Sequence, residues 1–156
     1  MEIGYRPRFS PPDDLGPGTE TFDPVIFSAQ YNVEHWSLTG EYARRPIKNE
    51  GFSTEFDSEI LGESYYMQGI YRLDPHWELV LRYDVSYFDV DNREADGSFA
   101  KDWTLGVRYN FTPSLMVRAE YHNVYGTLFL FPQDNPDTSA TETQWHLGAL
   151  LLSYRF

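Results

Sequence analysis

The feature that most constrains this chain is a strict alternation of apolar and polar side chains between Trp77 and Tyr87. Successive side chains of a β-strand point to opposite faces, so a period of two over this length predicts a strand with one apolar and one polar face. One phase carries Trp77, Leu79, Leu81, Tyr83, Val85 and Tyr87, and the other carries Glu78, Val80, Arg82, Asp84 and Ser86. The pattern recurs in segments 27–31, 36–42, 65–72, 103–110, 115–122 and 144–156, which predicts about seven strands.

The predicted connections alternate between short turns and long polar loops. Short turns are expected at residues 32–34, 73–76 and 111–114, and long loops at 44–58, 89–101 and 126–141. Short turns at one end and long loops at the other are typical of outer-membrane β-barrels. Residues 1–24 are rich in proline and glycine, so we expect an irregular segment or an extracellular loop there, followed by barrel strands over 25–156. A strand at 1–9 would supply an eighth strand, and a seven-stranded piece would leave two open edges.

The alternation alone does not separate a membrane barrel from a soluble β-sandwich or a lipocalin-like barrel. The mean hydropathy of −0.52 fits a soluble protein, but a barrel wall averages its lipid-facing and lumen-facing side chains. No apolar run is long enough for a transmembrane helix. Two features favour the membrane: aromatic residues begin strands, as at Trp36, Trp77 and Trp103, and the polar phase carries full charges in mid-strand. Small soluble barrels fill their interior with side chains that are mostly apolar.

Composition excludes several classes of function. The net charge is −12 and the only lysines are Lys48 and Lys101, which argues against nucleic-acid binding. Cysteine is absent, so there is no thiolate metal site and no cysteine nucleophile. The acidic segment 89–97 superficially resembles a calcium loop, but Arg93 stands where an oxygen ligand is required. The four histidines show no metal spacing, and pairing Ser153 with His122 or His146 is an arbitrary choice, so we expect no cofactor and no enzyme activity.

Three segments carry a resemblance to a known group of proteins. Residues 106–122 (GVRYNFTPSLMVRAEYH), 134–137 (DNPD) and 150–156 (LLLSYRF) resemble the C-terminal part of bacterial outer-membrane porin-like proteins. The phosphate-selective porin superfamily is the nearest group, and the resemblance covers roughly residues 60–156. It implies an antiparallel transmembrane β-barrel, larger than this chain, of about 16 or more strands. It also implies the outer membrane of a Gram-negative bacterium, contact with lipid and lipopolysaccharide, the barrel assembly machinery as a partner, and often a homotrimer.

The terminal strand looks like an outer-membrane insertion signal through Leu150, Leu152, Tyr154 and Phe156. No apolar run follows Met1, so we expect a mature chain or an N-terminally truncated piece of a porin. The sequence predicts a porin-like channel for small hydrophilic solutes or ions, or alternatively a small non-conducting barrel that acts as an anchor or adhesion surface. In the channel, charged side chains guide solutes; in the small barrel, the same charges pair and fill the interior. The pore-lining candidates are Glu41, Arg72, Glu78, Arg82, Asp84, Arg108, Arg118 and Glu120.

Overall fold

The computed structural model describes residues 18–51, 57–130 and 141–156. These residues form one antiparallel sheet of eight strands, with a single short 3-10 turn, η1 (Val90–Asn92). No helix in the described part of the chain is long and apolar enough to span a bilayer. The strands are β1 (Thr19–Phe22), β2 (Val25–Asn32), β3 (Trp36–Glu50), β4 (Ser58–Arg72), β5 (Trp77–Tyr87), β6 (Phe99–Thr112), β7 (Leu115–Tyr125) and β8 (Gln144–Tyr154).

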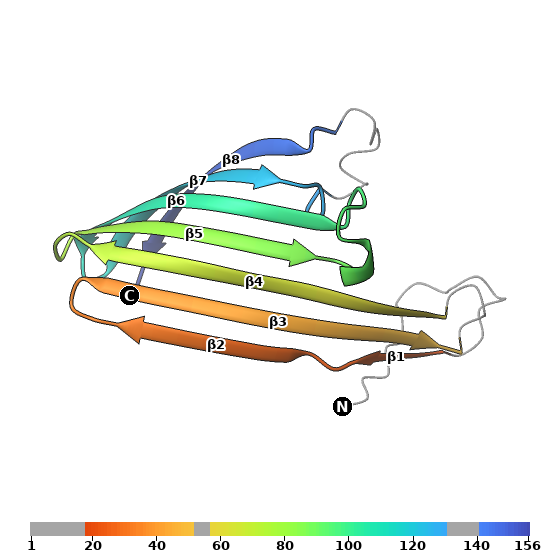
Figure 1. Cartoon of the computed structure of the whole chain (residues 1–156). Coiled ribbons are helices and arrows are strands. Elements are labelled where there is room, and N and C mark those ends of the chain that lie inside the picture. The colour runs from red at the N-terminus through yellow and green to blue at the C-terminus, as the bar shows by residue number, and fades with distance from the viewer. Residues whose placement is uncertain (1–17, 52–56, 131–140) are drawn as a thin grey trace.

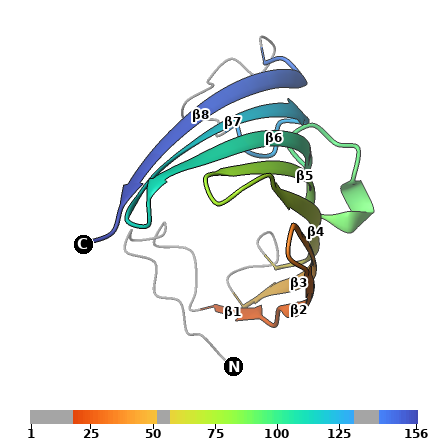
Figure 2. The same cartoon turned by 90° about the vertical axis from the view of Figure 1, so that its left-hand side faces the viewer.

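The sheet is a meander in which every strand from β2 to β8 pairs with the next one in the chain (Figure 1). Figure 2 looks from the turn end and shows that the sheet curls, so that one face is concave and the other convex. In the described residues the curl does not close, because β8 and the β1–β2 side have no partner strand. The antiparallel strands are thus confirmed, and a closed barrel is not formed by these residues. The expected strand at 1–9 and the segment 134–137 lie outside the described ranges.

The three predicted short turns are confirmed and lie together at one end of the sheet, the turn end, while the long connections lie at the opposite, loop end (Figure 1). In the turn between β4 and β5, Asp74 Oδ1 accepts hydrogen bonds from the backbone N–H of His76 at 2.7 Å and of Trp77 at 2.9 Å. These two bonds favour the charged carboxylate and lower the pKa of Asp74 below its ordinary value. Thr112 similarly accepts from the N–H of Leu115 at 3.0 Å. Local side-chain hydrogen bonds therefore hold two of the three turns, and the turn between β2 and β3 is held by the backbone bond from Val33 N–H to the Trp36 carbonyl at 2.8 Å.

Two expectations about irregular segments were wrong. Most of the expected loop at 44–58 is strand, because β3 runs to Glu50 and β4 begins at Ser58. Residues 19–22, expected to be irregular, form β1. β1 and β2 keep the same register against β3, with Phe22 opposite Ile47 and Val25 opposite Arg44. They are therefore one line of strand interrupted at residues 23–24, where proline removes an N–H donor.

Two boundaries also differ from the expectation. The terminal strand ends at Tyr154 rather than at Phe156, although Arg155 N–H still donates to the Ser114 carbonyl at 2.8 Å. Trp103 does not begin a strand, because β6 already starts at Phe99. A short polar run precedes Trp103, so the alternation pattern did not show that β6 begins before it.

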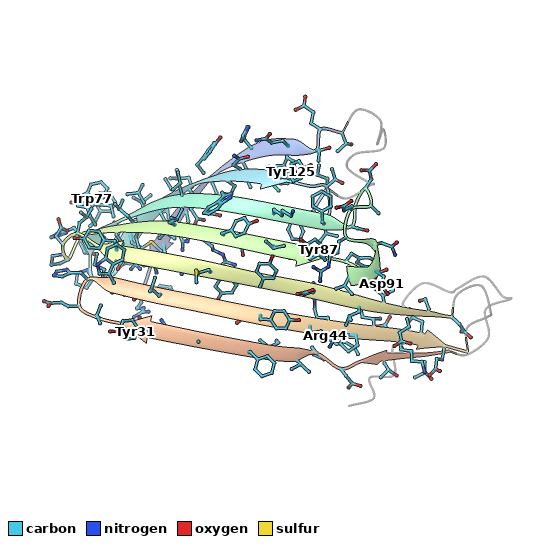
Figure 3. The ribbon with its side chains drawn as sticks, in the orientation of Figure 1. Tyr31, Arg44, Trp77, Tyr87, Asp91 and Tyr125 are labelled. Atoms are coloured by element: carbon cyan, nitrogen blue, oxygen red, sulfur yellow. The ribbon has the colours of Figure 1, made fainter. Side chains whose placement is uncertain are left out.

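The two faces differ in exposure as the curl requires. On the concave face, side chains converge, and Ser37, Thr104 and Ala100 are each 2% exposed. On the convex face side chains diverge, and Met67 is 70% and Leu105 58% exposed. A small apolar core also forms on the convex face at the loop end, where the connection between β5 and β6 covers Val85 and Tyr87. Figure 3 shows Trp77 at the turn end and Tyr87, Asp91 and Tyr125 at the loop end.

Candidate functional site on the concave face

The strand register places all eight candidate pore-lining residues on the concave face. Glu41 lies in a row with Tyr66 and Asp84, and Arg72 lies in a row with Glu78. Each of the other candidates lies opposite one of these residues, or an even number of residues away from one along β5, β6 or β7, and therefore belongs to the same face. The concave side therefore carries Glu41, Arg72, Glu78, Arg82, Asp84, Arg108, Arg118 and Glu120.

At the turn end, two arginines share one carboxylate. Glu78 lies 3.6 Å from Arg72 Nε and 3.3 Å from Arg108 Nη1. Arg72 Nη2 also donates to the buried hydroxyl of Ser37 at 2.7 Å, and Arg108 Nε donates to Asn110 Oδ1 at 2.9 Å. This group, called the turn-end cluster, has one more positive than negative charge.

Near the middle of the sheet, two arginines pair with the carboxylate two residues further along their own strand. Arg82 Nε donates to both carboxylate oxygens of Asp84 at 2.9 and 2.7 Å, and Nη2 donates to Oδ1 at 2.5 Å. The Arg82 guanidinium also lies 4.0 Å above the ring of Tyr66. Arg118 pairs with Glu120 through Nη2 and Oε1, while Arg118 Nε is buried without a hydrogen-bond partner. Each of these charges is thus largely neutralised by a neighbour on the same strand.

The sequence reasoning missed a third element of this site, formed by Asp102, Thr104 and His122. Asp102 Oδ2 lies 2.6 Å from His122 Nδ1, and the Thr104 hydroxyl lies 3.0 Å from the same nitrogen and donates to Asp102 Oδ2 at 3.2 Å. Glu120 Oε2 is 4.0 Å from His122 Nε2. Asp102 Oδ1 is buried and has no hydrogen-bond partner. The available signal was the polar phase of β6, which extends back to Asp102 once the strand is started at Phe99.

These groups surround a pocket of about 330 Å³, here called the lumen pocket, on the concave face. Phe129 also lines it, and this ring comes from the segment that follows β7. Gly126 turns that segment, because its φ of 109° suits glycine and a Cβ there would lie 2.3 Å from the Phe99 carbonyl. The turn is held by Leu128 N–H, which donates to the Phe99 carbonyl at 3.1 Å. The lining is Arg82, Asp84, Ser86, Ala100, Asp102, Thr104, Arg118, Glu120, His122 and Phe129.

The arrangement at His122 does not match a catalytic relay. In such a relay the carboxylate orients one ring nitrogen while the other takes the proton of the nucleophile. Here the Asp102 carboxylate and the Thr104 hydroxyl both meet Nδ1. Ser153 lies opposite Met116 and not near His122, which lies opposite Leu147 six residues away along β8, roughly 20 Å. The contacts at His122 are those of a hydrogen-bonded polar cluster.

Metal ligation is not indicated either. No three histidine, aspartate or glutamate side chains in the described ranges come together as metal ligands. In the acidic loop, the Asp89 carboxylate accepts from Asp91 N–H at 3.1 Å and from Asn92 Nδ2 at 2.7 Å. Arg93 points away to Glu63 at 2.5 Å. The loop is organised by its own hydrogen bonds.

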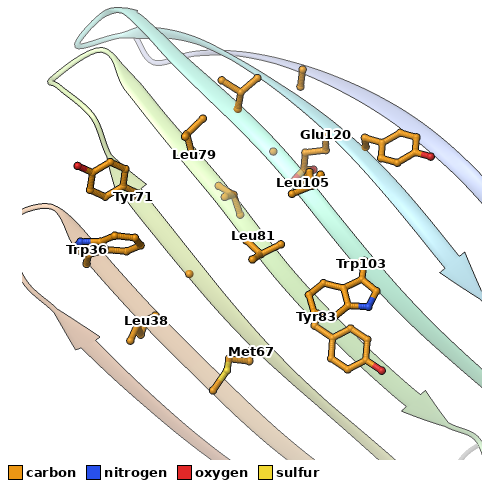
Figure 4. A pocket seen from close by; sticks show the side chains of 16 residues that line it. Trp36, Leu38, Met67, Tyr71, Leu79, Leu81, Tyr83, Trp103, Leu105 and Glu120 are labelled. Atoms are coloured by element: carbon orange, nitrogen blue, oxygen red, sulfur yellow. The ribbon is translucent and has the colours of Figure 1, made fainter.

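The convex face is apolar from the turn end up to a line of charged and polar residues. Leu38, Leu81 and Leu105 lie in one row across β3, β5 and β6. Aromatic pairs flank this band: Trp36 and Tyr71 have ring centroids 4.5 Å apart, Trp77 and Tyr109 4.6 Å, and Tyr83 and Trp103 4.5 Å. An open depression of about 970 Å³ lies between the first and last of these pairs (Figure 4). Towards the loop end the same phase carries Arg44, Glu63, Lys101 and Gln144.

Comparisons with protein-family models, with curated proteins and with solved structures find no match for this chain.

Proposed function

We propose that the sheet is part of the wall of a β-barrel in the outer membrane of a Gram-negative bacterium, and that its concave face lines a channel for small hydrophilic solutes or ions. The observation that carries the proposal is that the two faces of the sheet differ in polarity. Large apolar side chains cover the exposed convex face, whereas charges converge on the concave face. A soluble sheet would bury its apolar face, and a surface patch this large in water promotes association.

Lipid is the surrounding that suits this convex face. An outward apolar band edged by aromatic residues is the pattern of a membrane barrel, and its boundary by Arg44, Glu63 and Lys101 fits the start of the headgroup region. Lipopolysaccharide would be its neighbour on the loop side. The porin-like resemblance supports the same proposal, with insertion by the barrel assembly machinery and a homotrimer as the assembly.

The channel requires a closed wall, since sheet edges do not persist in hydrocarbon. The edges at β8 and at β1–β2 would therefore pair with further strands in the membrane. The lumen pocket is lined by acidic and basic side chains that remain partly exposed, 35% for Arg82 and 27% for Asp84, which supports water and ions on the concave side.

A second candidate is the non-conducting small barrel, and one observation favours it. Arg82 and Arg118 are each paired with a carboxylate, as expected of charges that fill a narrow interior. Planar-bilayer recording of the purified, folded protein separates the two. Stepwise ion currents are expected for the channel. A correctly folded sample with no current would contradict the channel and leave the anchor or adhesion barrel.

A further inference from the structure

The charges of the lumen pocket do not balance. Arg82 is paired with Asp84, and Arg118 is paired with Glu120, so that both guanidinium groups already have a carboxylate. Asp102 is the third carboxylate of the pocket; it contacts His122 Nδ1 and interacts electrostatically with Arg82, which is already paired with Asp84. The pocket lining therefore has three carboxylates, those of Asp84, Asp102 and Glu120, but only two guanidinium groups.

We propose that Asp102 makes the channel cation-selective, so that small cations are its preferred solutes. This inference rests on the proposed channel function and specifies its solute class. It departs from the phosphate preference of the porin group that the sequence resembles.

The position of Asp102 suits this role. Thr104 and Asp102 occupy the concave side of β6 directly beneath the segment that carries Phe129. The ring narrows the space beside the carboxylate, and a charge beside a narrow, partly apolar space acts more strongly on a passing ion than a charge in open water. Asp102 Oδ1 has no hydrogen-bond donor, and the hydrogen bonds of this carboxylate are made through Oδ2.

The acidic connection at the loop end, which lies over the convex side of the sheet, has the same sign. The connection between β5 and β6 carries Asp89, Asp91, Glu94 and Asp96, and its single arginine, Arg93, is held by Glu63. Acidic groups at this end raise the local concentration of cations. The turn-end cluster has the opposite sign, because Arg72 and Arg108 share Glu78. Cation preference is therefore a property of the loop-end half of the lumen.

The test is the reversal potential of the folded protein in a planar bilayer under a KCl gradient. Wild-type protein should prefer potassium over chloride. Asp102→Asn should lower the ratio of cation to anion permeability by about tenfold, because one charge about 6 Å from an ion in water-like surroundings has a Coulomb energy close to RT and acts with opposite sign on the cation and the anion. The matched control is Glu59→Gln, which removes the same charge from an exposed position on the convex side of β4 and should leave the ratio unchanged.

The outcomes separate this inference from the function on which it rests. Current with chloride preference in the wild type, or an equal ratio for wild type and Asp102→Asn, would overturn the cation assignment and leave the channel standing. An equal fall in Glu59→Gln would also overturn it, because the effect would then follow the total charge. No current in any folded sample would remove the channel itself. If Asp102→Asn does not fold, the wild-type reversal potential still decides the sign.

Discussion

Substituting Leu81 with lysine tests whether lipid covers the convex face. Leu81 is 50% exposed and lies in the row between Gly69 and Leu105, within the apolar band. In water, lysine at a half-exposed strand position changes the free energy of unfolding by about 0.5 kcal/mol or less. Near the bilayer centre of a barrel, lysine costs about 2–4 kcal/mol. The costs in the two surroundings therefore differ by about 1.5–3.5 kcal/mol, or roughly 10- to 300-fold in the folding equilibrium constant.

The matched control is Gln144→Lys, which adds the same charge on the convex phase of β8, in the row of Tyr125 and Lys101. At this level, close to the headgroups, lysine should cost about 0–1 kcal/mol. Urea titration of protein folded into phospholipid vesicles, followed by gel mobility without heating, measures both variants. Equal midpoints for Leu81→Lys, Gln144→Lys and wild type would refute a lipid-covered convex face.

Three further predictions follow from local geometry. Deleting Phe156, or replacing it with a charged residue, should reduce the heat-modifiable barrel in the outer-membrane fraction, and an unchanged amount would contradict an insertion signal there. Asp74→Ala should lower the free energy of unfolding at neutral pH but not in strong acid. The pKa of Asp74 is lower in the folded than in the unfolded protein, so the carboxylate stabilises the fold above the unfolded pKa, and this stabilisation is lost as the pH falls through the folded pKa. Urea midpoints of wild type and variant, measured across this pH range, test the prediction. Gly126→Ala should lower the free energy of unfolding, measured by urea titration, by about 1–3 kcal/mol or more, because the alanine Cβ would meet the Phe99 carbonyl. Gly97 also has a positive φ but has open space around it, so Gly97→Ala should cost less.

Most hairpins could be predicted, because the alternation within a strand shows its two faces and the residues of the turns at Asp74 and Thr112 favour a tight connection. Between Trp77 and Tyr87 only Val80 departs from the alternation, and the structure has a strand with the same bounds. The extension of β3 could not be predicted, because Arg44 and Arg45 put charge on both phases. A strand that leaves the apolar band has polar surroundings on both sides, and alternation then disappears although the backbone pairing continues.

The faces of β8 could not be assigned from its sequence either. Between Leu147 and Leu152 both phases are largely apolar, so the period does not say which phase is convex. The pairing with β7 decides it, because Leu152 lies opposite Val117 and Leu151 lies opposite Arg118. Leu150 and Leu152 thus belong to the convex face, in the phase that the sequence predicted for Tyr154.

The cluster at Asp102 depends on a register that counting from the turn would miss. Thr112 lies opposite Leu115, but Asn110 lies opposite Met116, so Phe111 is an extra residue in β6. Without this bulge, Thr104 would lie opposite Asn123 rather than His122. A slip of one residue moves every side chain to the other face. The partner of Asp102 and Thr104 is thus set by a local irregularity that the alternation pattern does not contain.

The number of strands limits what could complete the wall. β1 and β2 form one line, and six successive antiparallel pairings separate β2 from β8, so both edge strands run in the same direction. A second copy in the same orientation would bring its β2 parallel to β8, and an inverted copy would place its acidic loop end among the short turns. If an odd number of additional strands lies between β8 and β2, both edge strands gain antiparallel partners. The short turns then stay at one end of the barrel and the long loops at the other. A complete barrel containing this sheet therefore has an even number of strands, as bacterial outer-membrane barrels do.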